Sequence, residues 1–161
     1  MSDEYEKYML GGKSSAAKKA SALLKAKHTC SYIEEILSEV ETPVVVYTDH
    51  VDSCLAIANH FKVRPIHGGV SVEDRAEIAK NFRVLVATIG SFSVGVTLTQ
   101  AKNLVFNDLS WIPADNYQAL KRIHRIGQNE TCVIHYVLGG RVDKFILNMI
   151  RDKMKVIEAV K

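Results

Sequence analysis

Two arginines in the last third of the chain have the spacing needed to hold a single anion. Arg122 and Arg125 lie three residues apart in the run Q-A-L-K-R-I-H-R-I-G-Q, which spans residues 118–128. Side chains at this spacing share one face of a helix, and each guanidinium can bind phosphate oxygens through two donors. Gln118 precedes Arg122 by one turn of the same predicted helix. The spacing alone is equally compatible with a solvated basic helix end, where cations are favoured.

The predicted helix that positions these arginines has recognisable start and stop signals. Pro113 suits a first helical turn, and Asp115 places an acidic side chain near the positive end of the helix dipole. Gly127 is a typical residue at a helix C-terminus. The sequence therefore predicts a helix over 113–125.

Short β-branched runs alternate with amphipathic stretches along the rest of the chain. The runs predict strands at 44–47, 84–87, 103–106 and 133–137, with a shorter one at 63–67, and the amphipathic stretches are 51–61, 71–82, 113–125 and 142–158. Strands that are apolar throughout are typical of a parallel sheet covered on both faces. Ligands bind such sheets at the carboxyl ends of the strands. The segments expected there are 48–50, 67–69, 88–90, 107–108 and 138–140.

The N-terminal region differs in composition from the remainder. Residues 13–27 carry five lysines and no acidic side chain, after the pair Gly11-Gly12. We interpret residues 1–29 as a lead-in that passes into a basic helix, and 30–161 as the folded domain. A separate second helix is predicted from Cys30 to Glu39.

The bulk composition excludes several classes of protein. A chain of 161 residues with 47% hydrophobic residues suits one globular domain, and its net charge of +3 is weak evidence for a nucleic-acid partner. The three cysteines are widely spaced and odd in number, which favours thiols in a reducing intracellular compartment, cytoplasm or nucleus. Since no apolar run approaches the ~20 residues of a membrane span, no membrane association is expected.

Other catalytic motifs fail on spacing. Gly12-Lys13-Ser14 lacks the glycine that a phosphate loop needs five residues earlier, because that position is Lys7. Asp108 follows an apolar strand like a magnesium-binding aspartate, but without a phosphate loop a structural or positioning role is favoured. The histidines have no metal-ligand spacing, so no metal site is predicted. No G-x-S-x-G elbow of a serine hydrolase occurs.

Four segments in order resemble superfamily-two helicases. They are residues 66–75 followed by Phe82, residues 84–98, residues 108–113 and residues 118–128. The last segment, ending H-R-I-G-Q, is similar to the Snf-type remodeller and translocase branch. The resemblance covers about residues 30–158 and implies the second RecA-like lobe, a three-layer α/β/α domain with a mainly parallel central sheet.

The resemblance also implies roles for individual residues. Arg122 and Arg125 would act as arginine fingers on ATP, with Gln118 helping to orient the site, and the cofactor would be ATP with Mg2+, bound mainly by an absent first lobe. Gly95, Val96, Gln118, Arg122 and Arg125 would contact the nucleotide. His67, Gly68, Gly69, Arg75, Thr88 and Trp111 would contact nucleic acid. For Arg75 the alternative is an ion pair with Glu73 or Glu77, and for Trp111 it is core packing.

The sequence departs from the family pattern at two places that the resemblance implies are involved in the response to nucleotide. Phe92-Ser93-Val94 replaces a run of glycines, with Thr97 in place of the family's asparagine, and Ile112 replaces the asparagine of W-N-P. Neither departure changes the two arginines. A diverged member, viral and acting in a host cell, is one interpretation.

The implied function is that of a C-terminal lobe of an ATP-dependent double-stranded DNA translocase or helicase. Its partners would be duplex DNA and an N-terminal RecA-like lobe, in cis or in trans, and the isolated lobe is expected to be monomeric and inactive. The alternative is a non-catalytic DNA- or protein-docking module derived from such a lobe. An RNA helicase lobe is disfavoured, because the W-x-P and H-R-I-G-Q segments resemble the DNA-translocase branch.

Overall fold

Four parallel strands form the centre of the molecule. The computed structural model describes residues 13–91, 96–124 and 130–139, together with 143–144, 147–148 and 151–152. The strands are β1 (Val44–Thr48), β2 (Val84–Thr88), β3 (Asn103–Phe106) and β4 (Val133–Tyr136), in the order β2-β1-β3-β4. Their bounds agree with the sequence prediction to within one residue. The shorter strand expected at 63–67 is reduced to a single parallel bridge between Ile66 and Ala87.

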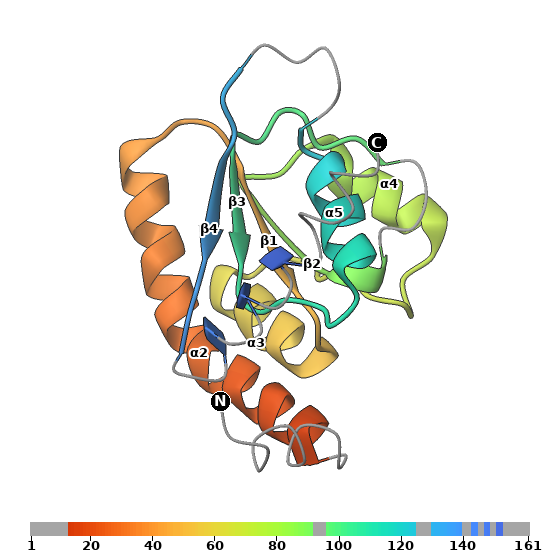
Figure 1. The fold of residues 1–161 in the computed structure, drawn as a ribbon. Coiled ribbons are helices and arrows are strands. Elements are labelled where there is room, and N and C mark those ends of the chain that lie inside the picture. The colour runs from red at the N-terminus through yellow and green to blue at the C-terminus, as the bar shows by residue number, and fades with distance from the viewer. Residues whose placement is uncertain are drawn as a thin grey trace.

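Helices cover both faces of this sheet. The helices α2 (Lys13–Glu39) and α3 (Val51–Phe61) pack on one face, and α4 (Val72–Lys80) and α5 (Pro113–Lys121) lie on the other (Figure 1). Along β1, Val44 and Val46 belong to the core under α2 and α3, whereas Val45 and Tyr47 belong to the core under α4 and α5. All β1 residues are buried, as expected for a strand between two helical layers. The predicted three-layer α/β/α fold is confirmed.

The first helix is longer than the sequence predicted. A single helix of 27 residues runs through the expected boundary at 29/30, so the prediction of two separate helices is wrong. A buried stripe at helical spacing continues across that boundary, formed by Ala22, Lys25, Ala26, Thr29, Cys30, Ile33 and Ile36. Its first half consists of alanine and polar side chains. The stripe was therefore not recognisable as apolar periodicity.

Local signals explain where α4 and α5 begin and end. Ser71 caps α4 by accepting a hydrogen bond from the Asp74 amide at 3.1 Å. Pro113 opens α5, which ends at Lys121, several residues before the expected end at 125. The amides of Arg122 and Ile123 bond to carbonyls three residues earlier, and this tightening ends the regular α-helix. Residues 125–129, including Gly127, lie outside the described part of the chain.

The order of the strands defines where the chain reverses its direction across the sheet. From β1 the chain forms β2 on one side and then crosses to β3 on the other, so the topological switch point lies between β1 and β3. The first half of α2 extends past the carboxyl ends of the strands (Figure 1). Among the described helices, none is long and apolar enough to cross a membrane.

Candidate functional site

Two loops at the carboxyl end of the sheet are joined by one arginine. We call residues 67–70 and 88–91 the open loop pair. Arg75, near the start of α4, donates from Nε to the Val70 carbonyl at 2.9 Å and from Nη2 to the His67 and Gly68 carbonyls at 3.3 and 3.4 Å. Its Nη1 donates to the Ser91 carbonyl. The guanidinium thus binds main-chain oxygens of both loops, and the expected alternative, an ion pair with Glu73 or Glu77, does not account for its position.

The two glycines of the first loop differ in their surroundings. Both are exposed. A Cβ on Gly68 would meet no other atom within 4 Å, whereas a Cβ on Gly69 would approach the His67 ring to 3.0 Å. The Gly69 amide already donates to Nδ1 of the half-buried His67 at 3.1 Å. Open space for a ligand's approach therefore lies at Gly68.

Thr88 and Trp111 are less accessible than the sequence suggested. Thr88 ends β2 with only 8% exposure, and its amide donates to the Ile66 carbonyl at 2.9 Å. That amide is therefore engaged within the sheet and is not available to a phosphate. Trp111 is half-buried and packs against the core under α4 and α5, in line with the alternative of core packing.

The segments expected to contact nucleotide meet at the end of α5. Arg122 lies at the C-cap of this helix, and its carbonyl accepts a hydrogen bond from the Leu98 amide at 2.8 Å. This bond ties the segment after Gly95, beginning with the half-buried Val96, to the arginine backbone. Gln118 is exposed one turn earlier on α5. Gly95 and Arg125 lie outside the described residues.

The side chain of Arg122 is half-buried and interacts electrostatically with β1. Tyr47 on β1 is fully buried, which raises the pKa of its phenol, and the positive charge of Arg122 opposes part of that rise. The Tyr47 ring also packs against Phe106, with the ring centroids 5.7 Å apart. Arg122 is therefore anchored through its backbone to the 96–98 segment and lies close to the buried phenol of the central strand.

A second polar region occupies the topological switch point. We call it the switch-point cluster, and it consists of Lys18, Thr48, Asp49, His50, Asn107 and Asp108. Asp108 accepts hydrogen bonds from Thr48 Oγ1 at 2.5 Å and from the Asp49 amide at 3.1 Å. The buried Lys18 ammonium lies 2.6 Å from Asp49 and 3.7 Å from Asp108. These contacts agree with the positioning role predicted for Asp108.

A buried amide links this cluster to α2. Asn107 Oδ1 accepts from Thr29 Oγ1 at 2.6 Å, and its Nδ2 donates to the Ala22 carbonyl at 3.0 Å. Both side chains are fully buried. The first half of α2 is thus held to the end of β3 by hydrogen bonds as well as by charge.

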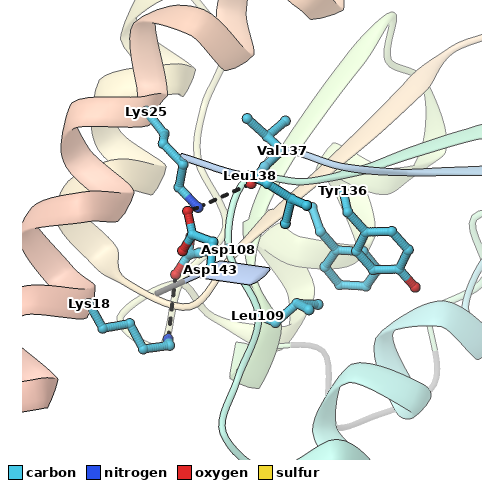
Figure 2. Close-up of a pocket in the computed structure, with 9 residues that line it drawn as sticks. Lys18, Lys25, Asp108, Leu109, Tyr136, Val137, Leu138 and Asp143 are labelled. Atoms are coloured by element: carbon cyan, nitrogen blue, oxygen red, sulfur yellow. Dashed lines mark hydrogen bonds and ion pairs between the residues drawn. The ribbon is translucent and has the colours of Figure 1, made fainter. Parts of the chain in front are cut away.

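Lys25 makes a similar contact one heptad after Lys18. Its ammonium lies 2.9 Å from Asp143 and donates to the Val137 carbonyl at 3.1 Å, and Asp143 accepts from the Gly139 amide at 2.6 Å. Figure 2 shows both lysines directed from α2 toward the sheet. The cavity between the two ion pairs measures about 20 Å³, room for about one water molecule.

The cluster contains groups that could ligate a metal, but a lysine already neutralises them. Potential ligand atoms of Asp49, His50 and Asp108 lie within 4.8 Å of one another. Burial lowers the pKa of His50, and the nearby Lys18 charge lowers it further. Burial raises the pKa of Asp49, against the lowering effect of Lys18. The arrangement is a set of charges compensated within the protein, with Lys18 and Asp108 buried and Asp49 partly exposed.

Sequence reasoning missed Lys18, Lys25, Thr29 and Asn107. One signal was present: Lys18 and Lys25 lie at positions i and i+7, in phase with Ala22, Thr29 and Ile33. Lysines on the buried stripe of a helix indicate internal ion pairs. Asn107 and Asp108 also lie at the expected strand end, but their partners come from residues far away in the sequence.

Comparison with known proteins places this geometry in a family. The model of the helicase conserved C-terminal domain matches residues 25–127. The human protein "DNA annealing helicase and endonuclease ZRANB3" is 31% identical over 150 residues, which cover 86% of this chain and 14% of that protein. DNA repair protein RAD5 of Candida albicans is 30% identical over 148 residues, which cover 85% of this chain and 14% of that protein.

A further relative and one solved structure agree with this result. The SWI/SNF-related matrix-associated actin-dependent regulator of chromatin subfamily A-like protein 1 of Xenopus tropicalis is 31% identical over 150 residues, which cover 85% of this chain and 16% of that protein. The crystal structure of the C-terminal part of the Fun30 ATPase domain aligns with a TM-score of 0.61 at 22% identity, covering 93% of this chain and 47% of the other. The chain spans less than a fifth of each of these three full-length relatives. It belongs to the helicase conserved C-terminal domain family and has the fold of a second RecA-like lobe.

Proposed function

We propose that this chain is the C-terminal lobe of an ATP-dependent double-stranded DNA translocase, to which it contributes two arginine fingers and a grip on the DNA backbone. The main support is the hydrogen bond between the Leu98 amide and the Arg122 carbonyl. It joins two segments that are far apart in the sequence and both resemble nucleotide-contacting helicase motifs. The half-buried side chain of Arg122 extends from this junction.

The residues at the end of α5 suit a triphosphate. Arg122 and the exposed Gln118 offer N–H donors, which bind phosphate oxygens and not metal ions. Mg2+ with ATP would supply charge neutralisation at the phosphates, and the metal would be held by the first lobe. Phosphoryl transfer is catalysed mainly by positioning and by neutralising charge on the transferred group. A second arginine three residues after Arg122 would add to that neutralisation.

The open loop pair suits binding to a phosphate backbone. The exposed main chain at Gly68 has open space in front of it, so it can approach a phosphate closely. Main-chain donors read the backbone and carry no sequence information. Binding through such donors should therefore be independent of sequence.

The alternative function is a non-catalytic docking module. The exposed Ile112 supports it, with 57% of its surface accessible at the position where the family has asparagine. An apolar side chain there suits a protein contact better than a hydrogen bond to nucleotide. The intact arginine pair is the argument against this alternative.

The test uses this chain joined to, or mixed with, a matching first RecA-like lobe. We expect ATP hydrolysis that is stimulated by duplex DNA more than by RNA. Arg122→Ala or Arg125→Ala should reduce kcat by roughly 10³-fold or more, because each removes a finger, while DNA affinity is largely kept. Turnover is measured with saturating DNA.

Lys121→Ala is the matched control for removing a cation from the same helix end. The Lys121 ammonium lies 4.9 Å from the centre of the Tyr117 ring, and its loss should leave kcat within about twofold, because it is assigned no part in the finger pair. Unchanged hydrolysis in both arginine variants would contradict the finger assignment. Absence of hydrolysis with the first lobe present would favour the docking module.

A further inference from the structure

Arg75 connects two loops that the sequence places apart. Its guanidinium donates to the carbonyls of His67, Gly68 and Val70 in one loop and to that of Ser91, sixteen residues further along, in the other. Arginine has five N–H donors in a planar fork, and these contacts use three or four of them. Little donor capacity is left for an external phosphate.

The direction of these bonds determines which side of the loop faces outward. Carbonyl oxygens of both loops converge on the guanidinium, whose positive charge offsets their partial negative charges. Without this cation the converging oxygens would repel one another and would also repel an approaching phosphate. With it, the main chain at Gly68 is left exposed with open space in front of it.

We propose that Arg75 is a positioning residue for the DNA grip: it holds residues 67–70 against Ser91 so that the main chain at Gly68 meets a backbone phosphate, and it does not itself contact the DNA. The proposal rests on the proposed DNA-binding function and deepens it. It gives Arg75 an indirect role in place of the direct nucleic-acid contact that the resemblance implies.

A second arginine, at the opposite end of the sheet, also binds main-chain carbonyls of two neighbouring segments. Arg83 donates to the carbonyls of Leu37, Val40, Glu41 and Thr42 at distances between 2.5 and 2.9 Å, where α2 ends and β1 begins. Both arginines thus bind four main-chain carbonyls. Arg83 lies at the amino ends of the strands, away from the loops proposed to bind DNA. Its substitution therefore shows what the loss of a carbonyl-binding guanidinium does by itself.

The salt dependence of DNA binding separates positioning from direct contact. A side chain that neutralises one phosphate contributes about 0.9 to the slope of log K against log salt concentration. A residue that only positions uncharged amides contributes nothing to the slope. Arg75→Met in the two-lobed protein should therefore weaken binding to random-sequence duplex roughly tenfold, through lost hydrogen bonds, with an unchanged slope.

The measurement is fluorescence anisotropy of a labelled duplex at four or more salt concentrations, below the melting temperature of each variant. Arg83→Met should bind DNA like the parent protein at every salt concentration. A slope that falls by about 0.9 in Arg75→Met would show a direct phosphate contact and overturn the proposal. Unchanged affinity in Arg75→Met would also overturn it.

Gly68→Ala is a second variant that does not depend on the folding of Arg75→Met. The new methyl meets nothing within 4 Å in the protein, so the melting temperature should be unchanged. DNA affinity should fall severalfold, because the methyl would occupy the space of the phosphate. Parent-like affinity in Gly68→Ala would overturn the proposal. If the parent protein does not bind duplex DNA, the proposed function itself fails, and this inference with it.

Discussion

The carboxyl edge of the sheet carries two polar regions that are built in opposite ways. In the switch-point cluster, Thr48, Asn107 and Asp108 are buried, and α2 supplies Lys18 to the carboxylates and Thr29 to the amide. In the open loop pair, Arg75 binds main-chain carbonyl oxygens, and Gly68 and Gly69 remain exposed. Both regions lie where ligands of parallel sheets are expected, yet only one of them is accessible.

This difference qualifies the general rule for open parallel sheets. Ligands usually bind at the topological switch point, where neighbouring strand connections diverge and leave a crevice. Here the first half of α2 fills that position and brings its own cations to it. The accessible polar groups are therefore found beside β2 and at the end of α5. Topology indicates the correct edge of the sheet, and the N-terminal helix decides which part of that edge is exposed.

The largest expected effect comes from breaking the buried ion pair at the switch point. Lys18→Met leaves Asp49 and Asp108 without their cation, and removing one partner of a buried pair costs roughly 3–5 kcal/mol. The adjacent Lys19 pairs with Asp52 at 2.9 Å, with both side chains about half exposed. Lys19→Met should therefore cost less than ~1 kcal/mol.

The free energy of unfolding in urea distinguishes these two variants. Their positions are consecutive on one helix and their substitutions are identical, so burial is the main difference between them. Equal losses of unfolding free energy in the two variants would mean that the Lys18 ion pairs stabilise the protein no more than an exposed pair does. DNA affinity at a temperature where both variants are folded should not differ between them.

A smaller loss is expected from the neutral part of the same cluster. Thr29→Val removes the hydroxyl that donates to Asn107 Oδ1 and keeps nearly the same shape. A buried acceptor left without its donor costs about 1–3 kcal/mol. Ser31→Ala is the control, because the Ser31 hydroxyl is exposed and donates to the Lys27 carbonyl at 3.3 Å. Calorimetric melting should show a lower Tm for Thr29→Val and little change for Ser31→Ala.

Elements of secondary structure were predictable from the sequence to a greater extent than the contacts of the two polar regions. The strands were predicted within a residue, and β1, β2 and β3 are mainly apolar runs that are buried throughout. The residues of β4 are partly exposed, but they form an equally compact β-branched and aromatic run. The predicted stretch 71–82 begins where α4 begins, because the residues that start this helix, Ser71 and Asp74, are local in the sequence. Predictions of this kind depend on neighbours that the sequence itself supplies.

Contacts between distant segments were not predictable in the same way. Arg75 has carboxylates two residues away on either side in the sequence, yet its donors reach Ser91 because β2 brings that loop beside α4. The helix boundary at 29/30 was wrong because alanines and lysines form the buried stripe there, and their burial depends on strand ends more than 70 residues away. Such contacts exist only once the sheet has formed.

The smallest expected effect is a pH dependence that belongs to the switch-point cluster. Burial and the Lys18 charge lower the pKa of His50 below 6.5, so the unfolded chain binds a proton at a higher pH than the folded protein does. Stability is then complete above pH 6.5 and falls as the pH drops through the folded pKa, by at most ~1.4 kcal/mol per pH unit for this group. His135, whose pKa burial also lowers, acts in the same direction.

His50→Gln should therefore reduce, without abolishing, the loss of unfolding free energy between pH 7 and pH 5.5. Glutamine keeps a polar side chain of similar length at the start of α3 but does not titrate. His135→Gln should remove a separate part of the loss, because Tyr32 and Asn103 contact His135 outside the cluster. If His50→Gln shows the same pH dependence as the parent protein, the imidazole is not held neutral by the cluster. In that case Asp49 and Asp108 would cancel the effect of the Lys18 charge on the pKa of His50.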